Sequence, residues 1–473
     1  MAIFTRDKKF YGQLLTIAVP IALQNLINFS VSMADTVMVG LLGEVPLAAA
    51  NLANKFGMIF MLFTFGLGSG CNVMMAQFWG KKDTDSIHKI MTIMYRFLFV
   101  GGVFFSVLAI FFPMQIMAFF TPELETQLAG ADYLRIIGFS YLLTGFSSVS
   151  LSVLRSVSSV KIAVFVYLCS LGTNVFLNWV LIFGKLGAPA LGIQGAAIAT
   201  VIARVVEVII TVIYFLRVEN KILYRFRYLF NRNLGFVKDF FKTAGPVIVN
   251  EIIWGLGSAL ISAIIGHRGT AFTAADSVTG VLSQLVTITI WGVGHATAAI
   301  IGNTVGAGEY KKAKEYAKSM MVLSVILGLV SCGLVLLLRD PMVSLFDITP
   351  LAQTYSRQLI NVYSVVVIFQ SISAICLIGI LRGGGDTRFV LLMDLVFMWT
   401  ISIPLGFVAS AKLVLPVWIV YAVIRSDELF KTAFAMGRII RGTWVKDVTQ
   451  RGPVTPAEEA AIEEEERHEI LGE

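Results

Sequence analysis

Long apolar segments separated by short polar connections recur along the chain from residue 11 to residue 436. About 20 apolar residues in a row are enough to cross the hydrocarbon core of a bilayer as an α-helix. The pattern predicts twelve such helices, near residues 11–41, 49–78, 91–112, 131–155, 161–183, 192–216, 240–265, 275–304, 317–338, 352–381, 388–410 and 413–436. The first segment is too long for a cleaved signal peptide, so we interpret it as a membrane helix.

Basic residues concentrate in every second connection between these segments. Lys81 and Lys82 follow the second segment, and the long connection 217–242 is also rich in Lys and Arg, whereas the connection at 123–132 has neither. Connections rich in Lys and Arg stay on the cytoplasmic side of a membrane. We therefore expect a multi-pass protein of the cell membrane, with both termini in the cytoplasm.

The composition agrees with a membrane protein and argues against a soluble enzyme. Of the 473 residues, 57% are hydrophobic and 14% are charged, and the mean hydropathy is +0.80, whereas soluble domains carry about 25% charged residues. The topology explains the net charge of +7, so no nucleic-acid partner is expected. Nucleotide-binding, metalloprotease and zinc-site spacings are absent from the sequence, and the four cysteines are scattered. We expect a monomeric membrane protein without a cofactor.

The second half of the chain resembles the first. Segment 65–84 aligns with segment 291–310, so that equivalent positions differ by 226 in number (292 − 66 = 226), and the same offset pairs Pro20 with Pro246. An offset that spans six helices gives parallel repeats around an axis along the membrane normal. The predicted division is an amino-terminal six-helix bundle (1–216), a basic cytoplasmic linker (217–239), a carboxyl-terminal six-helix bundle (240–440) and a polar, acidic cytoplasmic tail (441–473).

Polar residues follow one face of the first predicted helix and of the fifth. Asn28, Ser32 and Asp35 are spaced by four and three residues, and Asn174 and Asn178 by four. Such spacing places side chains on one helix face. An ionised aspartate at the bilayer centre costs about 2.5–3.5 kcal/mol on insertion scales, and intramembrane acids usually serve a function. The alternative is a structural carboxylate that locks this helix to Asn174 or Asn178.

Two further acids lie in the seventh and eighth predicted helices. Glu251 shares a helix face with Ser258, and Asp276 lies near a predicted helix start, where N-capping is the competing interpretation. Arg204 and Glu207, three residues apart in the sixth helix, are expected to form a local ion pair.

The last two predicted helices and the turn before them carry the remaining charges. Asp386 lies in a glycine-rich turn, where capping is again the alternative, and Asp394 has no partner that the sequence identifies. Arg425, Glu428 and Lys431 share a helix face and are expected to form a self-neutralised cluster near the cytoplasmic end.

Several of these segments together resemble the multidrug and toxic compound extrusion (MATE) family of bacterial cation-coupled efflux transporters. They are "SMADTVMVGLLGEVPLAA" (32–49), "GLGSGCNVMMAQFWG" (66–80), "GIQGAAIATVIAR" (192–204) and "LRGGGDTR" (381–388). The resemblance covers residues 10 to 440. It implies an all-α membrane protein with twelve helices in two pseudo-symmetric bundles arranged as a V. It also implies export of organic cations or other amphiphiles in exchange for Na⁺ or H⁺.

The resemblance also assigns roles to individual residues. Asp35, Asn174 and Thr200 match the ion-coupling positions of the amino-terminal bundle, and Asn178 stands where some members have a second aspartate. Asp35 and Glu251 are the candidates for Na⁺ ligands. The candidates for ion or substrate binding in the second bundle are Glu251, Asp276, Asp386 and Asp394. The candidates for the substrate cleft are Asn28, Ser32, Trp254 and Ser258.

Two other functions are compatible with a polytopic membrane protein. A flippase for lipids or lipid-linked oligosaccharides of the same superfamily would place Arg and Lys in its cleft to bind phosphate. An intramembrane transferase would need paired acids for a Mg²⁺-diphosphate, and the sequence offers only a DxD in the connection 81–86. The charge pattern favours the efflux transporter over both.

Overall fold

The computed structural model describes residues 5, 7–230, 237–346 and 348–449, and all regular secondary structure in these ranges is helical. The first half contains α1 (Lys8–Gly40), α2 (Glu44–Gly80), α3 (Thr84–Phe111), α4 (Pro113–Phe120), α5 (Leu124–Ser156), α6 (Lys161–Phe183) and α7 (Gly192–Arg217). Six of these match the predicted helices, and the short α4 was not expected.

The second half is more irregular than the first. After the short helix η1 (Phe226–Phe230) it contains α8 (Val237–Gly266), α9 (Thr270–Gly306), α10 (Tyr310–Ser344), α11 (Pro350–Ala374), η2 (Ile375–Arg382), α12 (Thr387–Phe397), η3 (Met398–Ser402), α13 (Ile403–Phe407), η4 (Val408–Lys412), α14 (Val417–Ile424) and α15 (Asp427–Ile440). The segments η2, η3 and η4 are wound as π-helix. Such π segments inside α-helices often mark functional regions.

Eleven of the described helical segments are continuous, long and apolar enough to cross a membrane. In this count α11 with η2 is one crossing, and the helices from α12 to η4 are another. The twelfth predicted helix is present but broken into α14 and α15 at Arg425 and Ser426. The chain is therefore an all-α, multi-pass membrane protein with the predicted twelve crossings.

The internal repeat is visible in the helix boundaries. The offset found in the sequence also separates the first residues of four helix pairs, which are Glu44 and Thr270, Thr84 and Tyr310, Leu124 and Pro350, and Lys161 and Thr387. Helices α2 and α9 are also equal in length, at 37 residues each. The two halves therefore repeat the same order of helices, as the sequence predicted.

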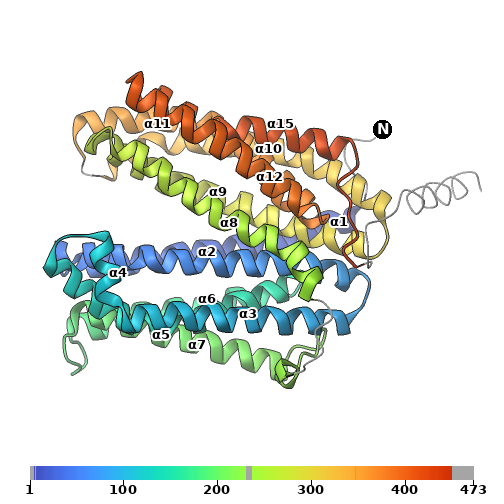
Figure 1. Cartoon of the computed structure of the whole chain (residues 1–473), viewed down its shortest axis with the longest axis horizontal. Helices are drawn as coiled ribbons and strands as arrows, with labels where there is room; N and C mark the ends of the chain where they lie inside the picture. Colours follow the sequence, from blue (N-terminus) through green and yellow to red (C-terminus); the bar gives the residue numbers. More distant parts are fainter. Residues whose placement is uncertain (1–4, 6, 231–236, 347, 450–473) are drawn as a thin grey trace, which may run out of the picture.

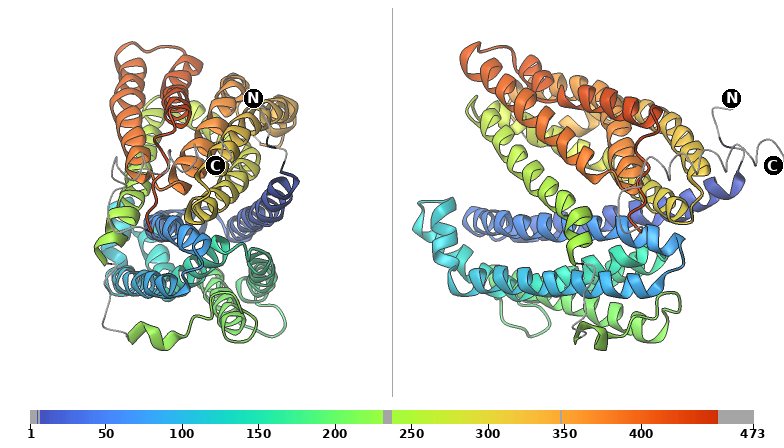
Figure 2. Two further views of the ribbon diagram at one scale, coloured as in Figure 1. Left: turned by 90° about the vertical axis from the view of Figure 1, so that its right-hand side faces the viewer. Right: turned by 45° about the vertical axis from the view of Figure 1, so that its right-hand side comes forward.

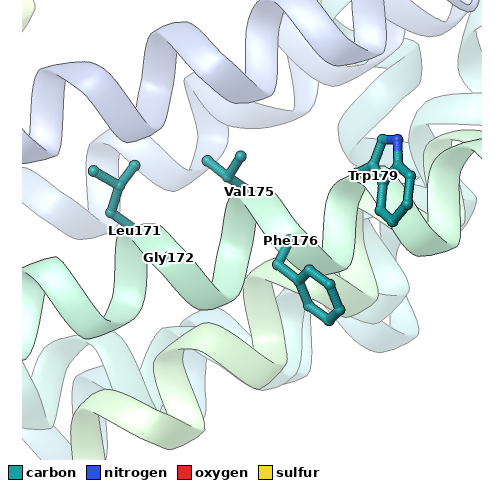
Figure 3. A pocket seen from close by; sticks show the side chains of 5 residues that line it. All are labelled: Leu171, Gly172, Val175, Phe176 and Trp179. Carbon is teal, nitrogen blue, oxygen red and sulfur yellow. The ribbon is translucent and has the colours of Figure 1, made fainter.

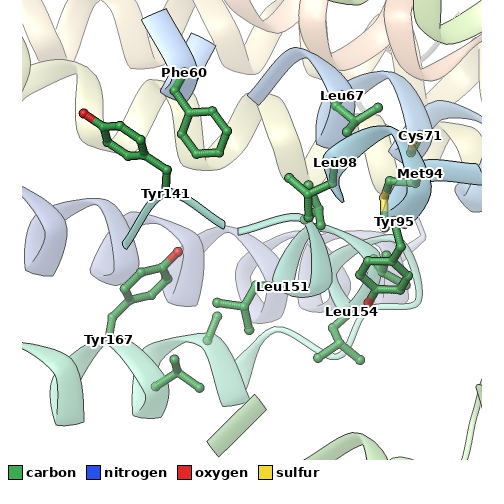
Figure 4. Packing of buried hydrophobic residues seen from close by; sticks show 14 of the residues in the cluster. Phe60, Leu67, Cys71, Met94, Tyr95, Leu98, Tyr141, Leu151, Leu154 and Tyr167 are labelled. Atoms are coloured by element: carbon green, nitrogen blue, oxygen red, sulfur yellow. The ribbon is translucent and has the colours of Figure 1, made fainter. Parts of the chain in front are cut away.

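The helices of the two halves form two groups that approach at one end and diverge at the other. Figures 1 and 2 show the divergence, with α4 at the open end of the first group. The core of the first group lies between α2, α3, α5 and α6, where aromatic and aliphatic side chains interlock (Figure 4). In this core the Tyr95 hydroxyl lies 2.8 Å from the Ser150 hydroxyl.

The beginning of α1 packs against the second half rather than the first. Phe10 stacks on Tyr316 of α10 with ring centroids 4.3 Å apart, and the Tyr316 hydroxyl donates to Asp7 at 2.6 Å. This hydrogen bond lowers the pKa of Asp7, whose carboxylate also caps α1 through the amide of Lys9. The first turns of α1 thus tie the two groups together at the closed end.

At this end α2 and α9 cross at equivalent positions of the repeat. A Cβ atom on Gly80 would lie 2.0 Å from the Asn303 carbonyl oxygen, and one on Gly306 would lie 1.8 Å from the Gln77 carbonyl oxygen. Gln77 is the repeat equivalent of Asn303 (303 − 77 = 226), as Gly80 is of Gly306 (306 − 80 = 226). Only glycine allows the two backbones to approach this closely.

We expect Gly80→Ala to force α2 and α9 apart and to destabilise this arrangement by about 1–3 kcal/mol, the usual range for overpacking. Thermal unfolding of the purified protein measures the effect. Gly333→Ala is the matched control, because a Cβ atom there would have no neighbour within 4 Å. Equal unfolding temperatures for the two variants would show that the crossing is not tightly packed.

Candidate ion and substrate sites

Asp35 lies on α1 and receives a hydrogen bond from a neighbouring helix. The Asn178 amide nitrogen donates to the Asp35 carboxylate over 2.5 Å. Asp35 is partly exposed, whereas Asn178 is buried. The sequence left open which asparagine contacts Asp35; Asn178 makes the short hydrogen bond, and Asn174 interacts with the carboxylate more weakly.

The other two predicted residues of the first bundle continue the same network. Asn178 also donates to the side-chain oxygen of Asn174 at 3.2 Å, and the Asn174 amide donates to the Thr200 hydroxyl at 3.3 Å. The spacing of four residues places both asparagines on one face of α6, and Thr200 is on α7. The structure therefore brings Asp35, Asn174, Asn178 and Thr200 together from three helices.

Two groups in this network lack a full set of partners: the carboxylates near Arg204 and the side-chain oxygen of Asn178. Arg204 pairs with Glu207 at 2.5 Å, as predicted, and interacts electrostatically with Asp35 as well, so two carboxylates share one guanidinium. The Asn178 side-chain oxygen is buried without a hydrogen-bond partner. Buried acceptors and charges are costly unless they are paired, so the site favours a bound cation.

We expect Asn178→Ala to move the acidic limb of the pH dependence of transport to higher pH by about one to two units. A hydrogen bond to a charged group contributes about 1.5–3 kcal/mol, and about 1.36 kcal/mol equals one unit. Without it the Asp35 carboxylate is easier to protonate. Substrate efflux measured across a pH series tests this, with Asn220→Ala, an exposed position between α7 and η1, as the control. An unshifted pH profile would contradict the role of Asn178.

Glu251 lies on α8 and faces the π segment η2. Its carboxylate pairs with Arg382 at 2.9 Å, and both side chains are largely buried. Arg382 also donates to the Ser69 hydroxyl of α2 at 3.1 Å, so it joins the second group of helices to the first. Because Glu251 already has a positive partner here, this conformation disfavours Na⁺ at Glu251.

Asp394 has partners that the sequence did not identify. Lys431 of α15 lies 2.8 Å from Asp394 and 2.8 Å from Asp427, and the Asn250 amide donates to Asp394 at 2.9 Å. The sequence analysis missed Asn250 and Lys431 as site residues. The signal in the sequence that could have identified Lys431 is its spacing of four residues from Asp427, which is typical of an ion pair on one helix face.

These contacts correct the prediction that Arg425, Glu428 and Lys431 form a self-neutralised cluster on one face of the last helix. Lys431 pairs with Asp427 and with Asp394 of another helix. Arg425 lies over the Tyr421 ring at 5.5 Å, and Glu428 is hydrogen-bonded to Ser373 of α11. The three residues do not form one cluster because the helix breaks at Arg425.

Asp386 and Asp276 do not cap helices through their side chains. Asp386 precedes α12, but its carboxylate pairs with Arg438 at 3.0 Å and with Lys446 at 2.5 Å. Asp276 lies within α9, six residues after its start, and interacts electrostatically with Arg425. The capping interpretation is therefore wrong for both, because the Asp386 carboxylate is held by two basic side chains and Asp276 lies inside α9 rather than at its start.

A segment after α15 connects the Asp386 turn to the first half. The backbone nitrogen of Lys446 donates to the Gly384 carbonyl at 2.8 Å, and the Gln77 side chain bonds the Lys446 carbonyl at 3.1 Å and the Val448 amide at 2.7 Å. These contacts belong to the closed end, next to Gly80. The acidic part of the predicted tail lies outside the described residues.

The candidate cleft residues make hydrogen bonds within their own helices. The Ser32 hydroxyl donates to the Asn28 carbonyl at 3.2 Å, and the Ser258 carbonyl accepts from Ser262 at 3.1 Å. Trp254 exposes 39% of its surface. Their role in substrate binding stays a prediction.

A shallow apolar hollow lies on α6, away from the asparagines. It is lined by Leu171, Gly172, Val175, Phe176 and Trp179, all from this one helix (Figure 3). Hydrophobic side chains exposed on a membrane helix are expected to contact lipid, so the hollow adds nothing to the ion site.

Comparison with known proteins agrees with the fold and the repeat. The MatE family model matches residues 20–180 and 246–408. Probable multidrug resistance protein YoeA of Bacillus subtilis (strain 168) is 25% identical over 417 residues, which cover 85% of this chain and 88% of that protein. Probable multidrug resistance protein NorM of Thermotoga maritima is 21% identical over 435 residues, covering 92% and 93%.

Solved structures of low sequence identity share the fold. An outward-facing multidrug resistance MATE family transporter of the MOP superfamily superposes with a TM-score of 0.82 at 15% identity, covering 93% of this chain and 99% of the other. The eukaryotic MATE transporter AtDTX14 gives 0.82 at 18% identity, covering 93% and 98%. Since the family model matches more than half of the chain, the chain belongs to the MATE family and is a membrane transporter, not an enzyme.

Proposed function

We propose that this chain is a secondary active antiporter that exports organic cations or amphiphilic xenobiotics in exchange for Na⁺ or H⁺. The observation that carries the proposal is the arrangement at Asp35. A carboxylate on α1 shares a single guanidinium with Glu207 and touches an amide whose oxygen has no partner. Binding a proton or Na⁺ there removes the unbalanced charge.

The cation is expected to act by changing the packing of α1. An ionised Asp35 holds Asn178 of α6 through a charged hydrogen bond. Neutralising the carboxylate weakens this bond, and Pro20 interrupts the backbone ladder of α1 and provides a place to bend. A movement of α1 that accompanies cation binding would release an organic cation held between the bundles.

The orientation and division of the chain complete the proposal. We place the α2–α9 crossing at the cytoplasmic side of the bacterial cytoplasmic membrane, with both termini there, so the bundles diverge toward the outside. The bundles are residues 1–216 and 240–440, joined by the basic linker 217–239, and one chain forms the transporter. The basic connections support this orientation.

The lipid flippase is disfavoured by the pairing of buried cations. Three of the buried cations in the described part of the chain are paired with acids: Arg204 with Glu207, Arg382 with Glu251, and Lys431 with two aspartates. Of the largely buried arginines without an ion pair in these ranges, Arg425 stacks on Tyr421 and Arg155 lies near Tyr167. A cleft for a lipid phosphate needs Arg or Lys side chains that are free to bind it.

Efflux of ethidium from proteoliposomes, with Na⁺ and proton gradients imposed separately, tests the proposal. A tenfold ion gradient stores about 1.4 kcal/mol, enough to drive ethidium against a gradient of up to about tenfold in one-for-one exchange. We expect one of the two gradients to drive such uphill movement. Ethidium movement that neither gradient accelerates would contradict antiport.

A further inference from the structure

A second group of buried charges lies in the carboxyl-terminal half, away from Asp35. Its centre is Lys431 of α15, whose side chain is 4% exposed and lies 2.8 Å from both Asp394 and Asp427. Glu428 lies on the same helix, three residues before Lys431, and interacts with it electrostatically. One ammonium group is thus surrounded by three carboxyl groups.

The neighbouring basic residues do not balance this excess. Arg382 of η2 is already paired with Glu251. Arg425 stacks on Tyr421 and interacts electrostatically with Asp276 as well as with Asp427 of the cluster, so it adds one positive charge together with one further acid. With all three carboxyl groups ionised, the cluster around Lys431 would carry a net charge of −2. An unpaired buried charge is costly, and proteins avoid it by binding a proton or another cation.

The hydrogen bonds of Ser373 are compatible with a proton on Glu428. The Ser373 hydroxyl on α11 is close enough to bond the Gln370 carbonyl, at 3.2 Å, and the Glu428 carboxyl group. A hydroxyl group has one hydrogen to donate. If Glu428 is protonated and donates to Ser373, the Ser373 hydrogen is left for the Gln370 carbonyl; if Glu428 is ionised, Ser373 donates to it and the two acceptors share one hydrogen.

A further unsatisfied acceptor belongs to the same cluster. Asn250 of α8 is 3% exposed, and its amide nitrogen donates to Asp394, but its side-chain oxygen has no partner. Both oxygens of Asp394 already accept, one from Lys431 and one from the Asn250 amide, so Asp394 is not the group that holds the proton. The unsatisfied Asn250 oxygen is independent of Ser373 and adds to the excess of acceptors over donors in the cluster, which a bound proton reduces.

We propose that this cluster is a second proton-binding site of the transporter, with Glu428 as the residue that carries the proton. The inference deepens the proposed function, on which its role in transport rests. Binding forms one O–H bond between a proton from water and the Glu428 carboxylate, and release returns that proton to water. When this proton is absent, ionised Glu428 competes with Asp394 for Lys431 and loosens the contacts between α12 and α15.

The groups around Glu428 act in opposite directions on proton binding. Asp427 on the same helix and Asp394 of α12 favour the protonated form, and Lys431 opposes it. From α11, Ser373 bonds the carboxyl group and Tyr363 interacts with it electrostatically. Of the other elements packed against α15, η2 contributes Arg382, which acts on Asp394.

Infrared spectroscopy of the purified full chain in lipid nanodiscs tests the site without requiring transport. We expect the carbonyl stretching band of a protonated carboxyl group at neutral pH, its loss on raising the pH, and its absence in Glu428→Gln. Glu309→Gln, an exposed residue paired with Lys312, is the matched control and keeps the band. A band that survives in Glu428→Gln, or one that no alkaline pH removes, would overturn the proposal.

Ser373→Ala provides a second test that holds if Glu428→Gln folds poorly. Ionised Glu428 accepts a hydrogen bond from Ser373, so removing the hydroxyl destabilises the carboxylate, and the midpoint of band loss moves to higher pH by about one to two units. An unchanged midpoint would show that the band belongs to another carboxyl group and would refute the assignment. The antiport proposal is tested separately by ethidium efflux, so either can fail alone.

Discussion

Replacing Asp35 by asparagine is expected to abolish cation-driven efflux while leaving the protein folded. The amide keeps the size of the side chain and can accept from Asn178, but it cannot bind a proton or balance Na⁺. Coupling free energies between two ligands are typically about 1–3 kcal/mol, roughly fivefold to 150-fold. We therefore expect an imposed gradient to accelerate ethidium efflux by a factor in this range in the wild-type protein and not to accelerate it in Asp35→Asn.

The control for this substitution is Asp85→Asn, the same chemical change at an exposed residue in the first turn of α3. It should leave efflux unchanged. Full gradient-driven efflux by Asp35→Asn would remove Asp35 from the mechanism, because coupling would then need no charge at this position.

Replacing Arg382 by methionine is expected to produce the largest loss of stability. It leaves Glu251 buried without its positive partner and removes the donor to Ser69 of α2. Removing one member of a buried ion pair costs about 3–5 kcal/mol. Thermal and denaturant unfolding of the purified variant measure this fall in the free energy of unfolding.

Two further variants distinguish the effect of leaving a buried charge unpaired from the effect of losing any arginine. The double substitution Glu251→Gln with Arg382→Met should recover most of the stability, since no buried charge is then left unpaired. Arg357→Met, which removes an exposed pair with Asp340, should cost less than about 1 kcal/mol. A double variant no more stable than Arg382→Met would mean that packing, not charge, explains the loss.

The sequence predicted most of the fold because two strong regularities determine it. Apolar segments of membrane length define the crossings, and the internal repeat carries over to the helix boundaries. The break between α14 and α15 was not predicted, because the polar residues 425–428 are also compatible with a continuous helix.

The two charged sites differed in how far the sequence could describe them. Asp35, Asn174 and Asn178 were expected to lie near one another because polar faces on separate membrane helices must face each other or a wet cavity, and because the family resemblance places them in one site. Asp394 and Lys431 lie far apart in the sequence, on the separate helices α12 and α15. Their pairing depends on how these two helices pack against each other, which helical spacing within one segment does not encode.

The two halves share a fold but not the positions of their acids. The position in the second half that is equivalent to Asp35 is 261 (35 + 226 = 261), and Ile261 is a buried apolar residue. The second half carries its charges on α8, α12 and α15 instead. A purely structural role would be expected to recur in both halves, so this asymmetry supports a specialised role for Asp35.

The most direct test of the central claim measures ion movement driven by substrate. Proteoliposomes loaded with ethidium, without any imposed ion gradient, are monitored for Na⁺ and proton uptake as ethidium leaves. Antiport at Asp35 predicts uptake of one of these cations by the wild-type protein and by Asp85→Asn, and none by Asp35→Asn. Ethidium efflux by the wild-type protein without uptake of either cation would contradict it.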